Sequence, residues 1–472
     1  MLTEQLDQTR LTVSPTLDPG RRSKLGQFMT PGRIAEFMAS MFDELPDNVR
    51  LLDAGAGMGA LTAAFVLEAC RRDRKPKSMD VTVYEVDPSL AAILRETLAS
   101  CADECAKVGI AFRSRVVLAD YILDAGQPLL TKRRHYNCVI LNPPYAKISS
   151  GSDWRAALRT VGIETVNLYT AFVGLALLQM EQGGELVAIT PRSFCNGPYY
   201  QPIRELILGE SALLTLHVFE DRRTAFKDDD VLQENLIFQL RKGGSQGPVR
   251  LSTDGGMARD VVFAEIVSPQ DRHRFIRFPV AGDDLAERVQ ALPCRLADLG
   301  ITVSTGRVVD FRAKEHLRKM PGAGTVPLVY PAHFENGRVG GAIVDFKKHN
   351  ALADNAQTAS LIVPGGTYVL TKRFSAKEEK RRLVAALYDG GPVGFENHLN
   401  YFHAGGRGLP ERLAQGLANF LNSEAVDDYF RTFSGHTQVN ATDLRNLHFP
   451  TVVQLEALAD TNDVDAAVRA LL

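Results

Sequence analysis

The sequence lacks the features that mark several large classes of protein. Its six cysteines are scattered, with no Cys-x-x-Cys pair and no nearby histidine at a spacing typical of zinc sites, so we expect reduced thiols and no bound metal. No apolar run approaches the roughly 20 residues that a membrane-spanning helix needs. Residues 1–12 also lack the apolar core of a signal peptide. These absences favour a cytoplasmic protein without a membrane partner.

An excess of charge of one sign is also missing. The 472 residues carry 54 basic and 56 acidic side chains, so the chain as a whole has no nucleic-acid signature. The charge is uneven, however, because residues 307–348 hold eight lysines and arginines against four acidic residues, and residues 372–382 hold six against two. A basic face on a near-neutral protein fits a local anionic partner. Ordinary solvated surface is the alternative for each cluster.

The composition, with 45% hydrophobic and 23% charged residues, is that of a globular protein long enough for two or three domains. We predict a polar N-terminal arm at residues 1–23, an α/β domain at 24–242, a linker at 243–249 and a second domain at 250–472. The linker prediction depends on the Gly-Gly-Ser-Gln-Gly-Pro stretch that begins at Gly243. Beyond it, short strands, turns and one helix at 409–433 favour an α+β fold.

The most informative stretch follows an apolar run at residues 139–141, which predicts a buried parallel strand. Asn142, Pro143, Pro144 and Tyr145 come directly after it. Two prolines stiffen this loop, and open α/β sheets bind ligands at the carboxyl ends of their strands. The Asn142 side-chain oxygen and the Pro143 carbonyl can accept both protons of an aromatic amine, while Tyr145 stacks on its ring. A proline turn that only ends a strand is the structural alternative.

A glycine turn lies further upstream in the sequence. A predicted strand at residues 49–52 leads through Asp53 into a Gly-x-Gly-x-Gly turn that begins at Gly55, and a helix follows. The glycines allow the backbone to approach a ligand closely. A carboxylate at Asp53 would repel a pyrophosphate but would attract an ammonium group.

The next two predicted strands also end in acidic residues. The second strand ends at Glu85, where a carboxylate commonly accepts from the two hydroxyls of an adenosine ribose. The third strand ends at Asp120, which can accept from an adenine 6-amino group. Each carboxylate alone can be explained as a strand-end or helix-capping residue. Together with Asp53 and Asn142, however, they predict an adenosyl amino acid as the ligand rather than a nicotinamide dinucleotide.

A helix is predicted to begin near residue 30. Thr30 is a good N-cap, and Pro31 suits the first helical position. Such a free helix N-terminus with a hydroxyl can bind a carboxylate, and an ordinary capped helix is the alternative. Later strand patterns, up to residues 236–240, complete a predicted sheet of about seven mostly parallel strands that ends in a hairpin.

With these residues assembled, the chain resembles the adenine-N6 DNA methyltransferases of bacterial type II restriction–modification systems over nearly its full length. Residues 27–31 resemble their N-terminal motif, and the loop at 142–145 resembles their catalytic loop. The resemblance implies a Rossmann-like methyltransferase domain that depends on S-adenosyl-L-methionine, followed by an α+β target-recognition domain. It assigns to the cofactor pocket Thr30, Pro31, Asp53, Ala54, Gly55, Gly57, Glu85, Val86, Asp120, Tyr121 and Asn142.

The resemblance also implies how the target base is held. Asn142, Pro143, Pro144 and Tyr145 form the catalytic loop, and Phe226 stacks on the flipped adenine from the other side. The neutral leaving group and the activated methyl donor need no metal and no strong base, so positioning carries the catalysis.

Two C-terminal stretches, at 303–312 and 434–444, resemble the start and the end of the recognition domain of this family. We expect the domain to bind double-stranded DNA, reading base edges with some side chains while basic side chains contact phosphates. The DNA-binding candidates are Arg307, Arg312, Lys372, Arg373 and Arg407.

Other interpretations of the same motifs stay open. The loop at 142–145 also serves N4-cytosine DNA methyltransferases, which more often carry serine at its first position, and shorter glutamine-N5 protein methyltransferases without a second domain. A restriction–methylation fusion would need a metal-nuclease constellation, which we do not find. A non-catalytic DNA-binding subunit is a further alternative. Such a subunit would not need the four strand-end residues Asp53, Glu85, Asp120 and Asn142, so their presence speaks against it. We expect a monomer that protects host DNA beside a separate cognate restriction endonuclease.

Overall fold

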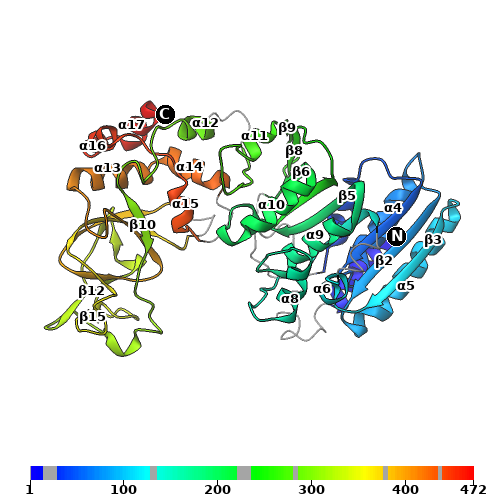
Figure 1. Ribbon diagram of the computed structural model, residues 1–472, viewed down its shortest axis with the longest axis horizontal. Helices are drawn as coiled ribbons and strands as arrows, with labels where there is room; N and C mark the ends of the chain where they lie inside the picture. The colour runs from blue at the N-terminus through cyan, green and yellow to red at the C-terminus, as the bar shows by residue number, and fades with distance from the viewer. Residues whose placement is uncertain are drawn as a thin grey trace. The chain divides into compact units, whose positions relative to one another are not determined.

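The computed structural model describes residues 2–13, 29–127, 135–219, 235–279, 285–375, 381–433 and 438–472. The chain divides into two compact units, Met1–Arg277 and Phe278–Leu472 (Figure 1). The boundary therefore follows Arg277. The linker that we predicted at 243–249 lies inside the first unit, and the pairing of the strands explains why.

A twisted sheet forms the centre of the first unit. Within the described residues it has nine strands in the order β3-β2-β1-β4-β5-β7-β6-β8-β9. Strands β1 to β5 pair in parallel, and β7 lies antiparallel between β5 and β6, which is the predicted Rossmann-like α/β arrangement. The strands span Asn48–Ala54 (β1), Ser78–Glu85 (β2), Ala111–Leu118 (β3), Tyr136–Leu141 (β4), Met180–Pro191 (β5), Ser211–Val218 (β6), Asn235–Lys242 (β7), Val249–Thr253 (β8) and Ala258–Val261 (β9).

The sheet is wider than the predicted seven strands because residues 249–261 join it. Strand β8 pairs in parallel with β6, and β9 pairs antiparallel with β8. The glycine-rich stretch before β8 turns across the start of β6, where the side-chain amide of Gln246 accepts from the backbone N–H of Leu213 and donates to its carbonyl, each at 2.9 Å. This pairing holds the turn against β6, and glycine content alone does not reveal it.

Helices cover both faces of this sheet (Figure 1). On one face α1, α3, α4 and α5 share an apolar core with the strands, in which Leu51 and Val83 are fully buried. On the other face α9 packs on β4 and β5, and the rings of Tyr84, Tyr121 and Phe172 follow one another at 4.9 and 5.0 Å. The helices span Leu2–Val13 (α1), Gly32–Ser40 (α3), Ala60–Arg71 (α4), Pro88–Lys107 (α5), Tyr121–Ala125 (α6), Asp153–Thr160 (α8), Leu168–Gln179 (α9), Gln201–Glu210 (α10) and Phe263–Ile266 (α11).

The predicted polar arm at residues 1–23 is helical in its described part. Helix α1 packs against α3 and α4 and buries Leu6 in the core. The Thr3 hydroxyl donates to Glu36 at 2.7 Å, and the backbone N–H of Gly32 donates to Asp7 at 3.2 Å. The arm is therefore a structural element of the first unit. Residues 14–23 lie outside the described residues.

The second unit is α+β, as predicted. Within the described residues it holds a six-stranded sheet in the order β10-β20-β17-β18-β14-β13 and a five-stranded sheet in the order β11-β15-β12-β19-β16. Among the described helices of either unit, none has the length and apolar character to cross a bilayer. The strands span Thr302–Thr305 (β10), Leu317–Arg318 (β11), Thr325–Val329 (β12), Phe334–Glu335 (β13), Arg338–Val339 (β14), Ala351–Ala353 (β15), Ile362–Val363 (β16), Gly366–Lys372 (β17), Ala385–Gly390 (β18), Val393–Phe395 (β19) and Leu399–His403 (β20), and the helices span Leu285–Gln290 (α12), Glu411–Leu421 (α13), Glu424–Phe433 (α14), Ala441–Arg445 (α15), Val452–Leu458 (α16) and Val464–Leu471 (α17).

The helix predicted at 409–433 is two helices, because the chain turns at Asn422. The Asn422 side-chain amide accepts from the backbone N–H of Ala385 at 2.9 Å and donates to the Ala385 carbonyl at 3.0 Å. Ser423 then accepts the first backbone bond of α14, from the N–H of Asp427 at 3.1 Å. An asparagine that pairs with a neighbouring strand thus ends α13, which helical periodicity does not predict.

A buried arginine ties the last part of the first unit to its sheet. Arg204 in α10 is fully buried. Its guanidinium donates to the carbonyls of Phe194 and Gly197 at 2.8 Å, and to the carbonyl of His273 at 2.8 and 3.0 Å. Since a buried cation is tolerated only when its N–H groups are paired, these carbonyls explain its presence.

Replacing Arg204 with methionine should lower the free energy of unfolding by about 3 kcal/mol, because buried carbonyls lose their donor. Urea titration followed by circular dichroism measures the change. Glu205→Gln, at an exposed position of the same helix, is the control and should stay within about 0.5 kcal/mol of the wild type. An unchanged unfolding midpoint for Arg204→Met would contradict this role.

Candidate functional site

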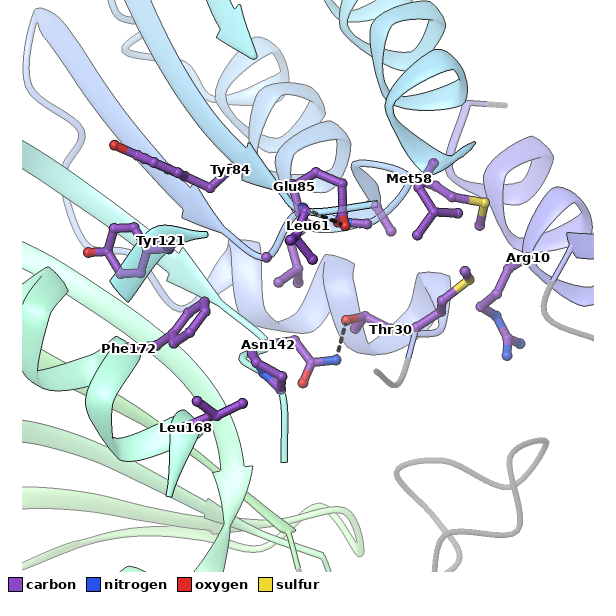
Figure 2. A pocket seen from close by; sticks show the side chains of 18 of the residues that line it. Arg10, Thr30, Met58, Leu61, Tyr84, Glu85, Tyr121, Asn142, Leu168 and Phe172 are labelled. Carbon is purple, nitrogen blue, oxygen red and sulfur yellow. Dashed lines mark hydrogen bonds between the residues drawn. The ribbon is translucent and has the colours of Figure 1, made fainter. Parts of the chain in front are cut away.

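A cavity opens where the strand order of the sheet reverses. Strands β2 and β3 lie on one side of β1, and β4 lies on the other, which is where α/β sheets bind ligands. The cavity spans about 1220 Å³, and part of this space is open to solvent. The predicted site residues that line it are Thr30, Gly55, Gly57, Glu85, Val86, Asp120, Tyr121, Asn142 and Pro144. Figure 2 labels Thr30, Glu85, Tyr121 and Asn142 among them. Pro31, Asp53, Ala54, Pro143 and Tyr145 do not line it.

The glycine turn after β1 forms one wall of the cavity. The backbone N–H groups of Gly55 and Ala56 donate to the carbonyl of Tyr84 at 3.0 and 2.9 Å, which fastens the turn to β2. Gly55 has a φ of 80°, a left-handed conformation in which other residues are strained. The turn therefore needs glycine for its backbone, and α4 begins directly behind it.

Glu85 joins the ends of β1 and β2. It is 3% exposed, and its carboxylate accepts from the backbone N–H groups of Val86 at 2.8 Å, Asp87 at 2.7 Å and Gly57 at 2.8 Å. Burial raises the pKa of the Glu85 carboxyl, and these N–H groups oppose that rise. Oε1 already accepts two of these bonds and Oε2 accepts one, so Oε2 keeps a lone pair with which it can accept from a hydroxyl group of a ligand.

Asp120 is held through both of its carboxylate oxygens. Oδ1 caps α6 by accepting from the backbone N–H groups of Ile122 at 2.9 Å and Leu123 at 3.1 Å. Oδ2 accepts from the indole N–H of Trp154, at the start of α8, at 2.8 Å. Both Asp120 and Trp154 line the cavity. The sequence-based prediction included Asp120 but missed its partner.

The side-chain amide of Asn142 is oriented from both ends. Its Nδ2 donates to the Thr30 hydroxyl at 2.9 Å (Figure 2). Its Oδ1 accepts from the Tyr145 hydroxyl at 3.2 Å. We predicted that Thr30 caps a helix, but Pro31 is the N-cap of α3, and the first backbone N–H of the helix, that of Gly32, donates to the Asp7 side chain of α1. The Thr30 hydroxyl instead contacts a residue 112 positions later in the chain.

The rest of the loop packs against the core. Pro143 is buried, and Tyr145 is partly buried, with its hydroxyl 3.4 Å from the carbonyl of Ile189. The Tyr145 ring meets the ring of Tyr169 edge-on, with 6.1 Å between ring centres. Burial raises the pKa of Tyr145, so this hydroxyl stays neutral at ordinary pH. Phe226, the predicted second base-stacking residue, lies outside the described residues.

Asp53 lies behind the glycine turn rather than in the cavity. It is fully buried, and its Oδ2 accepts from the Thr62 hydroxyl at 2.7 Å. Its Oδ1 is buried without a hydrogen-bond partner among the described residues. Burial raises the pKa of Asp53 to about 7, against the opposing hydrogen bond from Thr62. The carboxylate thus links the end of β1 to the first turn of α4.

The DNA-binding candidates differ in how firmly they are held. Arg307, Arg312 and Arg407 are exposed, and Lys372 and Arg373 are half-buried. The Arg307 guanidinium donates to the Tyr401 hydroxyl at 3.1 Å, and that of Arg373 donates to a backbone carbonyl at 3.1 Å. Arg312 stacks over the ring of Phe311, which is 76% exposed and was not predicted. These groups are placed on the second unit, and their roles stay predictions.

Sequence reasoning missed the parts of the cavity that come from helices α1, α8 and α9. Spacing places Leu6 and Arg10 on one face of α1, which was the only available signal. Helix α9 is buried on all sides, so no pattern singles out its cavity-facing residues. Among the described residues, no group of three or more histidine, cysteine or acidic side chains is arranged to hold a metal ion. The missed lining residues include Thr3, Leu6, Asp7, Arg10, Met58, Leu61, Tyr84, Trp154, Leu168 and Phe172.

Known proteins resemble this chain over most of its length. Residues 96–226 match the family described as Eco57I restriction-modification methylase. The chain is 45% identical to the type II methyltransferase M.PstI of Providencia stuartii, over 98% of this chain and 93% of that protein. It is 44% identical to the type II methyltransferase M.BsuBI of Bacillus subtilis, over 95% of this chain and 91% of that protein.

A solved structure has a similar fold over nearly the whole chain. The type IIL restriction-modification enzyme MmeI in complex with DNA has a TM-score of 0.62 over 96% of this chain and 76% of its own. The two sequences are 12% identical, so the likeness concerns the fold alone. It supports the arrangement of a Rossmann-like methyltransferase domain followed by a further domain.

The raised pKa of Asp53 predicts a pH-dependent stability. The folded protein binds this proton with a pKa of about 7, against about 4 in the unfolded chain, so the contribution of Asp53 to stability falls as pH rises through this window. Asp53→Asn removes the titration, and the variant should gain about 2 kcal/mol relative to the wild type between pH 5.5 and 8.5.

Urea unfolding of both proteins at the two pH values measures this difference. Thr62→Val removes a hydrogen bond that lowers the pKa of Asp53. The pH range over which this variant loses stability should therefore extend to higher pH than in the wild type. Parallel stability curves for the wild type and Asp53→Asn would show that Asp53 does not titrate in this range.

Proposed function

The chain belongs to the type II DNA methyltransferases of restriction–modification systems, and on that premise we propose that it methylates N6 of a flipped adenine in duplex DNA, with S-adenosyl-L-methionine as the donor. The observation that carries this proposal is the Asn142 amide, held by Thr30 at 2.9 Å on the edge of the cavity. A methylated adenine at a fixed site would protect host DNA from the partner endonuclease.

The chemistry of the cavity fits an adenosyl amino acid. Glu85 offers a carboxylate for the two ribose hydroxyls, and Asp120 offers one for the 6-amino group of the adenine. The backbone of Gly55 and Gly57 can pack against the amino acid part because neither glycine carries a side chain. When bound, S-adenosyl-L-methionine supplies an electrophilic methyl group on its sulfonium.

Asp53 supports this binding indirectly, without lining the cavity. Its carboxylate lies behind the glycine turn, where it holds Thr62 and thereby the start of α4. Its Oδ1 is buried without a hydrogen-bond partner among the described residues, and a nearby ammonium group, as in the amino acid part of the ligand, would stabilise the ionised carboxylate and lower its raised pKa. We therefore keep Asp53 among the cofactor residues as a positioning residue.

The catalytic loop can hold the target amine. The Asn142 Oδ1 and the Pro143 carbonyl are acceptors, and they suit the two protons of an adenine N6 amine. Hydrogen bonds in this direction keep the nitrogen lone pair out of the ring and available for attack. Tyr145 from the loop and Phe226 from outside the described residues would stack on the two faces of the flipped base.

The second unit is proposed to read the DNA sequence. Its basic candidates, Arg307, Arg312, Lys372, Arg373 and Arg407, suit phosphate contacts, since such contacts fix the register of a protein on the duplex. An N4-cytosine methyltransferase is the second candidate function, because cytosine carries an equivalent exocyclic amine that the same acceptors could hold. The base that becomes methylated decides between the two.

Long-read sequencing of plasmid DNA from cells that express the protein tests the proposal. We expect N6-methyladenine at one fixed motif with the wild type, and at least about 100-fold less with Asn142→Ala, because a positioned polar contact of the transition state is lost. S-adenosylhomocysteine should bind this variant within a few-fold of the wild type, as calorimetry can show. Unmodified DNA from well-expressed wild type would refute DNA methylation, and methylated cytosine would select the alternative.

The orientation of Asn142 by Thr30 gives a further prediction. Thr30→Val keeps the side-chain shape but removes the acceptor for Asn142 Nδ2, so the kcat of methylation at saturating S-adenosyl-L-methionine should fall about 10-fold. Thr30→Ser keeps the hydroxyl and should retain most activity. In the Asn142→Ala background Thr30→Val should have no additional effect, and an additive loss would place the role of Thr30 elsewhere.

A further inference from the structure

Trp154 is the single tryptophan of the chain, and it lies at the cavity rather than in a core. It is partly exposed, lines the cavity and donates its indole N–H to Asp120 Oδ2 at 2.8 Å. The two residues are 34 positions apart and come from different elements. No motif of the catalytic loop or of the strand ends requires a tryptophan at this place.

The indole bond completes the set of donors around Asp120. Oδ1 already accepts two backbone N–H groups at the start of α6, from Ile122 and Leu123. With the indole on Oδ2, both oxygens are fixed in direction. An indole N–H can only donate, so Asp120 Oδ2 is the acceptor in this contact.

The helix that carries Trp154, α8, is held by hydrogen bonds at both of its ends. Helix α8 is capped by Ser152, whose hydroxyl accepts from the N–H of Arg155 at 3.3 Å. At the other end of the helix the Thr160 hydroxyl donates to the carbonyl of Gly126 at 3.0 Å, directly after α6. The indole and the carboxylate are thus held by two helices that are bound to each other.

From this geometry we infer that Trp154 is a positioning residue that makes the Asp120 end of the cavity select a 6-amino purine. The inference rests on the proposed binding of S-adenosyl-L-methionine. Asp120, fixed as an acceptor, can receive a hydrogen bond from an amino group at position 6. It repels a carbonyl oxygen at the same position, because two acceptors then face each other. Without the indole bond the carboxylate loses one of its fixed directions, and this selectivity weakens.

Two ligands that differ at position 6 test the inference. S-adenosylhomocysteine carries an amino group there, and S-inosylhomocysteine carries an oxygen. Calorimetry on the full-length wild type should give at least about 30-fold tighter binding of the adenosyl ligand. Trp154→Phe keeps a ring but removes the N–H, and it should lower this ratio about 10-fold, chiefly through weaker binding of S-adenosylhomocysteine. A wild-type ratio in Trp154→Phe would overturn the inference.

The fluorescence of Trp154 gives a second readout that needs no variant. Because it is the single tryptophan, its emission at saturating S-adenosylhomocysteine reports directly on this end of the cavity. We expect a saturable change with the same Kd as calorimetry. Unchanged emission despite calorimetric binding would overturn the placement of Trp154 beside the purine. If the wild type binds neither ligand, the proposed function itself is refuted. This outcome differs from one in which the ligands bind but Trp154 has no effect on the selectivity, so the two results can be told apart.

Discussion

The parallel pairing of β1 with β2 on one side and with β4 on the other is the constraint on which the site depends. Ala54 lies opposite Tyr84, and Leu52 lies opposite Val139, so the three strands end at nearly the same level. The loops that follow them must then share one edge of the sheet. Backbone hydrogen bonds between the strands alone impose this arrangement, without any contribution from the side chains of the site.

Side-chain bonds then join these loops to one another. Glu85 holds the N–H of Gly57, and Thr30 holds the amide of Asn142. In each case a polar group of one segment is satisfied by another segment, so few groups must reorganise when a ligand arrives. Preorganisation of this kind reduces the entropy lost on binding. It also explains why the buried Glu85 carboxylate is tolerated, since backbone N–H groups pair with it.

The sequence predicted the fold where local patterns and strand ends decide it. Apolar runs that stop at Glu85, Asp120 and Asn142 placed these residues at one edge of a sheet, and the structure confirms that all three line one cavity. Contacts between distant segments left no local pattern, which is why Trp154 and the Thr30 hydroxyl bond were missed. The predicted domain boundary failed for the same reason, because the pairing of Gln246 with Leu213 is invisible in composition.

The attachment of residues 249–277 to the first unit bears on how the second unit can be exchanged between relatives. Strands β8 and β9 extend the sheet of the first unit, and His273 accepts from the buried Arg204. A chimera joined at the glycine-rich turn near Gly243 would pair a sheet edge from one parent with strands from another. A junction after Arg277 transfers the second unit whole. If that unit reads the DNA sequence as proposed, this junction is the suitable crossover point for changing the specificity.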